Sequence, residues 1–551
     1  MKSTWKLLFL RLMAFLRKEI KKSGTYLSVC ESYRDEAGRV QRRVLRHLGN
    51  ASDYTDESLE RIGRQLIEIV KGPAGEPQNI QEISRYNYGF PLVLHHLLRL
   101  YDLDVLLGRL GRKHKLSFSL LENLLLMLCD RFNDPLSKLG SYHLQNEYAG
   151  LGQGVGLQHI YRTLDYLAVN NDIIQAHIYN RNRNLFNYEL DVVFYDVTTF
   201  YFDSDVQKDG ALRQLGFGKD GKIGKTQILF SLLIDKNKVP IGFQIFKGDQ
   251  YEGHTFEKAV DKLKAKYNIK RIIVVADSSM LNTDNIALFD KGGKAEGFEY
   301  IVGDRLKNMS EPAIQHLTNL TNYTTVIIKD SEGKDIPLKY CTYPYKGRTV
   351  ICTWSESRAK KDKAEREDKI VKAKKMLKQP SGIEKKAKRY FLKNTGQRKY
   401  ELDQQKIDKQ VRFDGFKAIA TNVKDVTPQL ALEKYKDLYK IEQSFRSFKS
   451  YFETRPMFHW TDTRIEGHIV LCYISFCLLT FLQNKCGYSE QAIRRLLSKM
   501  ELSKIVQDGE VLWLRSATSD NAEHLLKTIK LKQLPTAISD ANMATHLPLH
   551  L

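Results

Sequence analysis

Two aspartates each close an apolar run of this sequence. Asp196 ends the run VVFYD and Asp277 ends the run IIVVAD. An acid at the end of a buried strand faces the edge of the sheet where open α/β folds bind their ligands, so two such acids can converge although they are far apart in the sequence. Each one alone is more often a strand-end or helix-capping residue. As a pair they indicate an acidic site at one sheet edge.

A third acid lies in the segment YKDLYKIEQSFRSFKS. Its residues Tyr435, Tyr439, Glu442, Arg446 and Lys449 recur at spacings of four, three, four and three, which predicts one face of a helix. One interpretation is an ion pair between Glu442 and Arg446, which contributes only tenths of a kcal/mol. The other is a metal-binding carboxylate with neighbouring cations placed for phosphates. The residues alone leave both open.

The three acids together would suit phosphodiester chemistry. Cutting or joining DNA requires an activated attacking oxygen and a stabilised leaving oxygen at one phosphorus, and two Mg²⁺ ions about 4 Å apart serve both needs. Carboxylates are the hard oxygen ligands that Mg²⁺ prefers. In this hypothesis Asp196 bridges the ions, Asp277 and Glu442 each complete one coordination sphere, and Mn²⁺ can substitute.

The segments around the acids predict a mixed α/β sheet. Strand-like runs occupy 191–202, 226–246 (bent at 235–238) and 271–277, the last with helical patterns on both sides, and a further strand at 414–422 leads into a long helix over about 428–451. We therefore expect these segments: 1–80, a small β-hairpin module (two strands over 26–49) with a linker; 81–188, a helical region; 189–310 and 411–485, the two parts of the core; 311–410, a β-rich insertion with a charged helix over 357–378; and 486–551, a helical C-terminal region.

Bulk properties narrow the class of protein. The chain has 551 residues, and its 42% hydrophobic content excludes a disordered or fibrous chain. A net charge of +22 attracts polyanions such as nucleic acid. Seven scattered cysteines without metal spacing indicate reduced thiols in a cytoplasmic setting without structural zinc. The apolar stretch 5–16 is not expected to be a signal peptide, and Met13 is an alternative start to Met1. The apolar run 469–482 is expected to be too short for a membrane span and to form a buried core helix.

Several blocks of the sequence resemble one family. They are YDVTTFYFDS (195–204), GFGKDGKIGKTQI (216–228), VPIGFQIFKGDQYEGHT (239–255), VVADSSM (274–280), RAKKDKAERE (358–367), FDGFKAIATN (413–422) and IEQSFRSFKSYFETRPMFHWTDTRIEGHI (441–469). With them the chain resembles the bacterial insertion-sequence DDE transposases of the IS-four superfamily. Within that superfamily it resembles the group of long members with Ile-Glu-x-x-Phe-Arg at the third acid.

The resemblance implies a fold and a function. The fold would be an RNase H-like catalytic core with a β-rich insertion, preceded by a small β-hairpin module and a helical DNA-binding region. The protein would bind terminal inverted repeats, cut DNA at the element ends and join the 3′-hydroxyls to target DNA. It would act as a homodimer in a synaptic complex at the bacterial nucleoid, with Asp196, Asp277 and Glu442 as catalytic residues. Alternatives are a Mg²⁺-dependent DNA nuclease without strand transfer and a catalytically inactive DNA-binding relative.

The resemblance also implies contacts to DNA. The superfamily signature Tyr-x2-Arg-x3-Glu-x6-Lys falls on Tyr435, Leu438, Glu442 and Lys449. Leu438 departs from the expected Arg. Arg446, one helical turn after Glu442, is a candidate to compensate for it. Some relatives hold a flipped base on a tryptophan of the insertion, a role open here to Trp354, for which packing is an equal alternative. Two lysines of a Gly-rich turn, Lys219 and Lys222, are either solvated or in contact with phosphate.

Overall fold

The computed structural model describes most of the chain in two compact units. One unit comprises Met1–Gln81 with Val506–Glu510, and the other comprises Glu82–Ile505 with Val511–Leu551. The structural account below covers residues 14–35, 39–71, 80–151, 155–186, 192–203, 206, 211–216, 225–251, 255, 259, 272–278, 298–329, 333–378, 391–396, 399–507 and 509–547.

The first unit is built on a three-stranded antiparallel sheet. Its strands β1 (Ala14–Lys21), β2 (Gly24–Arg34) and β3 (Val40–Asn50) are ordered β1-β2-β3, and helix α1 (Asp56–Lys71) follows. The hairpin expected over 26–49 is confirmed as β2 and β3, and β1 adds a third strand that lies before the predicted range. Gly24 allows the tight turn between β1 and β2, since its φ of +135° is unfavourable for residues with a Cβ.

The second unit contains a large mixed sheet. Among the described residues, ten strands belong to it, in the order β11-β12-β13-β16-β10-β9-β5-β7-β6, with β8 paired to β7. Strand β9 is parallel to both β5 and β10, and the other pairings are antiparallel. The strands are β5 (Val192–Tyr201), β6 (Gln214–Leu215), β7 (Thr226–Ile234), β8 (Pro240–Lys247), β9 (Ile272–Ala276), β10 (Phe298–Asp304), β11 (Thr324–Lys329), β12 (Asp335–Tyr345), β13 (Arg348–Trp354) and β16 (Phe416–Thr421).

The strand predictions for the centre of this sheet are confirmed. Strands β5, β7 and β9 lie in the three predicted runs, and β7 and β8 form a hairpin across the predicted bend. Asp235 holds that bend, since its Oδ1 accepts hydrogen bonds from the amides of Asn237 (2.8 Å) and Val239 (2.7 Å). The central strands are apolar on both faces, as expected for strands covered on both sides.

The segment expected as an insertion extends the same sheet. Strands β11, β12 and β13 continue it through β16, which pairs with both β13 and β10. The predicted charged helix is α11 (Glu356–Leu377), held to the entrance of β16 by a buried ion pair between Arg366 and Asp414. Around it lie α10 (Glu311–Thr318), α12 (Gln404–Val411) and the hairpin of β14 (Leu392–Gly396) and β15 (Lys399–Leu402).

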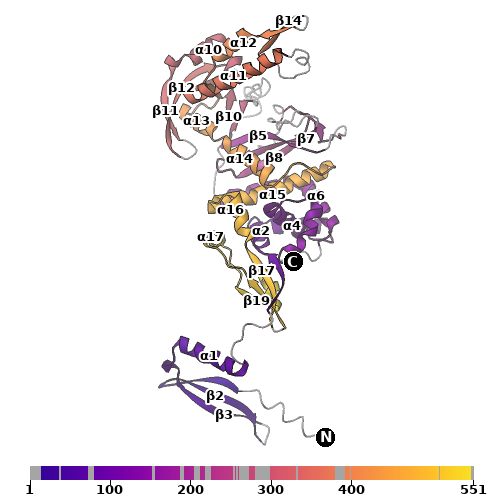
Figure 1. Ribbon diagram of the computed structural model, residues 1–551, viewed down its shortest axis with the longest axis vertical. Coiled ribbons are helices and arrows are strands. Elements are labelled where there is room, and N and C mark those ends of the chain that lie inside the picture. Colours follow the sequence, from indigo (N-terminus) through magenta and orange to yellow (C-terminus); the bar gives the residue numbers. More distant parts are fainter. Residues whose placement is uncertain are drawn as a thin grey trace. The chain divides into compact units, whose positions relative to one another are not determined.

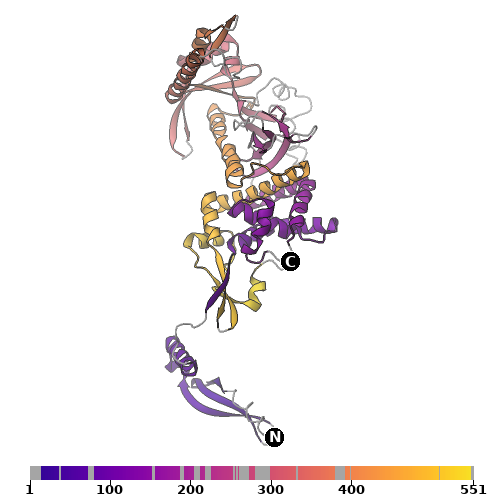
Figure 2. The ribbon, with the colours of Figure 1, turned by 45° about the vertical axis from the view of Figure 1, so that its right-hand side comes forward.

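One long apolar helix joins the sheet to a helical layer. Helix α15 (Asp462–Cys486) packs against β8 and against α4 and α6, and Figures 1 and 2 show it between the strands and these helices. Gly467 allows the close crossing, since a Cβ there would lie 2.1 Å from the carbonyl oxygen of Leu164. The helices of this region, as predicted, are α2 (Gly89–Leu100), α3 (Leu103–Lys113), α4 (Leu120–Asn133), α5 (Lys138–His143), α6 (Leu157–Val169) and α7 (Asn171–Phe186).

Helix α15 contains the apolar run 469–482. At 25 residues the helix is long and apolar enough to cross a membrane, so the expectation that this run is too short was wrong. However, 94% of its most apolar window is buried inside the protein. It is the core helix that the sequence predicted, and no other helix in the described part of the chain passes the same test.

The C-terminal region differs from the prediction. It was expected to be helical, but α16 (Glu490–Ser498), α17 (Asp520–Thr528) and α18 (Asp540–His546) alternate with strands β17 (Glu501–Gln507), β18 (Glu510–Arg515) and β19 (Ala537–Ser539). These strands form a four-stranded sheet in the order β19-β18-β17-β4, with β4 at Gln81–Asn87. Gly509, with φ of +84°, makes the turn between β17 and β18 possible.

Candidate active site

Two of the predicted acids stand on adjacent parallel strands. Strands β5 and β9 pair in the register Val193↔Val274 and Phe194↔Val275. Continuing that register by two residues brings Asp196 opposite Asp277. Because side chains alternate along a strand, both acids share the face of Phe194 and Val275, which belong to one core cluster. The fold therefore brings the two acids to the same end of neighbouring parallel strands.

The two acids differ in their surroundings. Asp196 lies in the middle of β5 rather than at its end, is half-buried, and its Oδ1 accepts a hydrogen bond of 2.8 Å from the amide of Val197. Strand β9 stops at Ala276, so Asp277 is the first residue beyond it and is exposed. Its Oδ1 accepts a hydrogen bond of 2.6 Å from the amide of Ser278. The accessible edge of the site is therefore at Asp277.

The third acid is carried by α14 (Tyr439–Arg446), which packs on β5 and β7. Ile441 and Phe445 fix this helix by joining the same core cluster, and the ring of Phe445 lies 6.2 Å from that of Phe230 on β7. Glu442, next to Ile441, is exposed. Helix α14 thus covers the face of the sheet on which Asp196 lies.

The prediction of one long helix over 428–451 was wrong. The segment forms α13 (Pro428–Lys436), a turn, α14 and then a π-helical turn at Ser447–Tyr451. In the turn the amides of Leu438 and Ile441 bond to carbonyls three residues back instead of four, which changes the phase of the helix. Consequently the five residues predicted on one helical face are divided among three elements.

The candidate DNA contacts of that segment are accordingly separated. Tyr435 is buried on α13, Arg446 is exposed at the end of α14, and Lys449 is half-buried in the π-helical turn. Among the described ion pairs, none joins Glu442 to Arg446, so the simple salt-bridge interpretation of this pair is wrong. Leu438 packs against the hydrophobic core instead of presenting a cation.

The carboxylates of Asp277 and Glu442 influence the pKa values of Tyr435 and Lys417. Burial raises the pKa of the Tyr435 hydroxyl, and the carboxylates of Asp277 and Glu442 raise it further, while Arg358 opposes them. Burial and Arg358 lower the pKa of Lys417, against the opposite effect of the same two carboxylates. The Lys417 amino group lies 4.7 Å from the centre of the Tyr435 ring. Asp277 and Glu442 therefore act on one shared environment.

The oxygen atoms of the three acids suit a hard divalent cation, but the three side chains are not close enough together to hold one. Among the described residues, which include all three acids, no group of three His, Cys, Asp or Glu side chains is close enough to hold a metal ion. Ionised carboxylates repel one another at short range, and a bound cation relieves that repulsion. What the residues offer is carboxylate oxygen, the ligand type of Mg²⁺.

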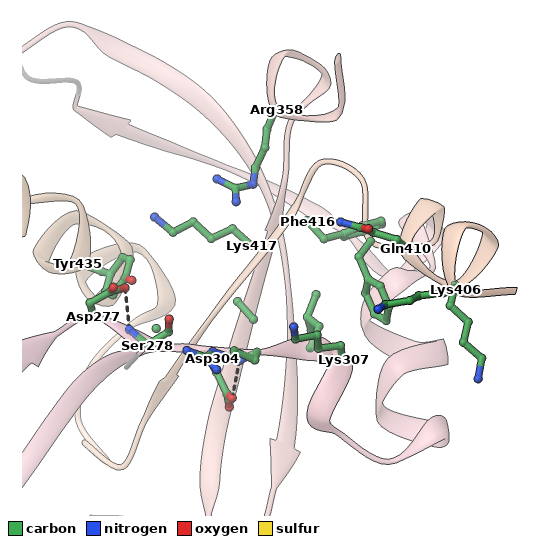
Figure 3. A pocket seen from close by; sticks show the side chains of 16 residues that line it. Asp277, Ser278, Asp304, Lys307, Arg358, Lys406, Gln410, Phe416, Lys417 and Tyr435 are labelled. Atoms are coloured by element: carbon green, nitrogen blue, oxygen red, sulfur yellow. Dashed lines mark hydrogen bonds between the residues drawn. The ribbon is translucent and has the colours of Figure 1, made fainter. Parts of the chain in front are cut away.

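A basic pocket of about 550 Å³ opens beside Asp277 (Figure 3). Of the two acids in its lining, Asp304 is neutralised by Arg348, its partner at 3.1 Å. In Figure 3, Lys417 and Arg358 extend toward the side of the pocket occupied by Asp277 and Tyr435. Cations from four elements or their ends line the pocket: Arg305 and Lys307 after β10, Arg358 on α11, Lys406 and Lys409 on α12, and Lys417 on β16.

Sequence reasoning did not identify these six cations. Two of them lay in segments already noted: Arg358 in the charged run 357–378, whose basic surplus suits a DNA backbone, and Lys417 in the strand predicted at 414–422. The others are single lysines and arginines in unremarkable contexts, which only the fold collects. Such a pocket can bind the phosphates of a polyanion next to the acids.

The remaining predicted residues have separate outcomes. Trp354 is half-buried at the end of β13, paired with Phe416, and the Lys339 amino group lies 5.8 Å from its ring. It also packs over Gly415, where a Cβ would lie 2.6 Å from the indole nitrogen. These contacts are those of a packing residue, and its predicted role toward a base remains a prediction. Lys219 and Lys222 lie outside the described residues.

One of the comparisons with known proteins identifies a family for part of the chain. A search of curated proteins gave no match. The solved structure of a piggyBac transposase synaptic complex with hairpin DNA aligns over 84% of this chain and 84% of that one, at 8% identity and a TM-score of 0.36, a likeness too weak to carry an argument. Residues 16–77 match the family described as IS1634 family transposase, N-terminal domain. The first unit of this chain is therefore similar to the N-terminal domain of IS1634 family transposases, which supports an insertion-sequence transposase.

Proposed function

We propose that this protein is an insertion-sequence transposase of the DDE type, in the IS-four superfamily. It binds terminal inverted repeats, cleaves DNA at the element ends and joins the 3′-hydroxyl ends to target DNA. One observation carries the proposal: the β5–β9 register brings Asp196 opposite Asp277 on the face that α14, the helix of Glu442, covers. The match of residues 16–77 supports the same family of activities.

The catalytic core in this proposal is RNase H-like. The supporting observation is the strand arrangement β8-β7-β5-β9-β10, in which three antiparallel strands adjoin two parallel ones. The first acid lies on the central strand and the second follows its parallel neighbour. The third comes from a helix packed on the same face. This arrangement lets residues distant in sequence converge without a long loop.

Asp196, Asp277 and Glu442 are the proposed ligands of two Mg²⁺ ions, for which Mn²⁺ can substitute. The ions, when bound, would activate the attacking oxygen and stabilise the leaving oxygen. Asp196, from its half-buried position on β5, would supply the shared ligand, and the exposed Asp277 and Glu442 would approach from either side. DNA phosphates in contact with the ions would complete the coordination.

The basic pocket would hold the DNA strand beside these acids. Lys417 packs over the Tyr435 ring, and Arg358 extends toward the same side of the pocket (Figure 3), so they would bind phosphates next to the scissile bond. Arg305, Lys307 and Lys409 would extend the contact along the backbone. Tyr435, Arg446 and Lys449 remain proposed contacts to the element end, with the protein acting as a homodimer in the bacterial nucleoid.

The experiment uses the full chain, Mg²⁺ and duplex DNA containing one element end with its flanking sequence. A transposase yields cut ends and strands joined to a target plasmid, a nuclease yields cut ends alone, and an inactive relative yields binding alone. Asp196→Asn, Asp277→Asn and Glu442→Gln should each lower cleavage at least about 1,000-fold while the Kd for the DNA end changes little, since a transition-state interaction is lost.

Glu367→Gln is the matched control, because Glu367 is an exposed acid on α11 that does not line the basic pocket. It should cut DNA at the normal rate. Normal cleavage by any one of the three acid variants would remove that residue from the proposed metal site.

A further inference from the structure

A second pocket, of about 410 Å³, lies apart from the acids. Its walls come from the end of α4, the start of α5, and the segment Phe452–Thr461 that connects the π-helical turn after α14 to α15. The volume is in the range of sites for small ligands, about 300–1,000 Å³. The proposed chemistry uses none of the side chains that line it.

The floor of this pocket carries buried positive charge. Lys138 is 3% exposed, and its Nζ has no hydrogen-bond partner. Arg131, also buried, donates to the carbonyls of Phe452 (2.8 Å) and Leu136 (2.6 Å), while its Nε has no partner. An unpaired cation in the interior costs free energy unless an anion compensates it.

The nearest carboxylates do not supply that compensation. Asp130 is buried behind Lys138, but its Oδ2 accepts from the Ser141 hydroxyl (2.8 Å) and the Leu136 amide (3.3 Å) and forms no described ion pair with Lys138. Burial, followed by the charge of Arg131, lowers the pKa of Lys138 to about 7 despite the opposing charge of Asp130. Glu453 lines the pocket but is exposed. Among the described residues, no carboxylate therefore pairs with Lys138.

The rim carries two exposed aromatic rings. Phe458 is 67% and Trp460 is 66% exposed. The guanidinium of Arg213, itself buried, lies 4.6 Å from the ring of Trp460 and 4.6 Å from that of Phe202. This stack holds one side of the indole in place while most of its surface stays open to solvent. Exposed aromatic rings beside cations are the combination that binds successive bases and phosphates of a nucleic acid strand.

The segment with these rings is tied to the strand of the first acid. The Met457 amide donates to the Tyr201 carbonyl (3.1 Å) at the end of β5, and the Thr454 amide and hydroxyl both donate to the Phe448 carbonyl. At about 3.3 Å per residue, Tyr201 lies roughly 17 Å along β5 from Asp196. The segment that carries the two rings is therefore fixed to the same strand as the first acid.

We infer that this pocket binds one nucleotide of a DNA strand, with its phosphate at Lys138 and its base, or the next one, stacked on Trp460 or Phe458. Arg455 and Arg464, which also line the pocket, extend the positive field at its mouth. The inference rests on the proposed function only in taking DNA as the polyanion. It does not depend on metal chemistry, because none of the three acids lines the pocket.

The test measures binding of a fluorescein-labelled single strand of twelve thymidines to the full chain in EDTA, so that loss of cleavage cannot affect it. Trp460→Ala and Phe458→Ala should each weaken binding about 5- to 50-fold, the range of one lost base stack. Lys138→Met should weaken it to a similar extent. The controls are Tyr251→Ala, an exposed aromatic outside the pocket, and Lys113→Met, an exposed lysine on α3, and both should bind normally.

Two further measurements separate the alternatives. A strand with 5-iodouracil at each position should crosslink on irradiation to the peptide containing Phe458 and Trp460, and crosslinks confined to other peptides would overturn the inference. Inorganic phosphate, at a phosphate concentration equal to that of the strand, should not displace it. If phosphate displaces the strand and Trp460→Ala binds normally, the pocket is a site for free phosphate and the inference is wrong. Since Trp460 and Phe458 are exposed, unchanged thermal unfolding is expected for their variants.

Discussion

The hydroxyl of Tyr435 lies directly over Gly303. A Cβ added at Gly303 would sit 2.6 Å from the Tyr435 hydroxyl oxygen and 2.9 Å from the amide nitrogen of Ser278. This amide donates to Asp277, so three parts of the candidate site meet at one position without a side chain. This position on β10 requires glycine, because a larger residue would overlap with the Tyr435 hydroxyl.

Gly303→Ala should therefore displace Tyr435 or the Ser278 turn by a few tenths of an ångström or more. We expect the cleavage rate to fall about 10- to 100-fold, the effect of a small misplacement of catalytic groups, with binding of the DNA end retained. Gly111→Ala is the control, since a Cβ at Gly111 would meet no atom within 4 Å. Equal cleavage rates for the two variants would contradict the proposed packing.

The basic pocket should govern the salt dependence of DNA binding. Replacing both Arg305 and Lys307 by alanine should reduce the slope of log K against log salt by about one to two, because each lost phosphate contact no longer releases a counterion. Affinity measured by anisotropy from low to moderate salt gives this slope. The double replacement Lys361→Ala with Lys527→Ala is the control, since these exposed lysines lie outside the pocket. An unchanged slope in the pocket variant would show that DNA does not occupy this pocket.

Lys138 predicts an unusual pH dependence of stability. Its pKa in the folded protein, about 7, is below the ordinary 10.5, so the charged form disfavours folding. That penalty is complete below pH 7 and decreases as pH rises from 7 toward 10.5. Lys138→Met should therefore stabilise the protein by about 2–4 kcal/mol at pH 6 and by little near pH 10.

His459 and His468 do not add to this difference. Burial lowers the pKa of His459 to about 3 and the pKa of His468 well below its usual value, so both stay neutral between pH 6 and 10. Denaturant unfolding of the wild type, Lys138→Met and the exposed control Lys113→Met at both pH values measures the effect. A stabilisation by Lys138→Met that is equal at the two pH values would exclude the charge of Lys138 as its cause.

Removing one partner of the ion pair between Arg348 and Asp304 should lower the stability of the protein. Both side chains are only 7% exposed and lie 3.1 Å apart, joining β13 to the end of β10. Arg348→Met leaves a buried carboxylate without its partner and should destabilise the protein by about 3–5 kcal/mol. The double variant Arg348→Met with Asp304→Leu should recover much of that loss in denaturant unfolding. If the double variant is as unstable as the sum of the single ones, the two residues are not coupled.

Local periodicity was sufficient for many elements. The β7–β8 hairpin, the charged helix α11 and the buried helix α15 were all predicted from the spacing of their own apolar and polar residues. Such patterns are local, because each residue's burial follows from the face it occupies on its own element. The net charge of +22 likewise required no fold to indicate a polyanionic partner.

Other elements depended on contacts with distant segments. The division of 428–451 into α13, α14 and a π-helical turn follows from packing on the sheet, where Ile441 and Phe445 must reach the core. The segment of strands β17 to β19 was expected to be helical, and the sheet that these strands form is completed by β4, which pairs with β17 and comes from a distant part of the chain. Pairing of this kind overrides weak local preferences.

The sequence by itself determined which residue types were available for chemistry: acids after two apolar runs and a third on a helix. Only the tertiary structure decided that Asp196 lies opposite Asp277, because the relative register of two strands is set by hydrogen bonds between segments far apart in the chain. The same holds for the six cations of the basic pocket and for Lys138 and Trp460, which line one pocket. The sequence specifies the type and charge of each residue. Which distant residues lie close together depends on the packing of segments that are far apart in the chain.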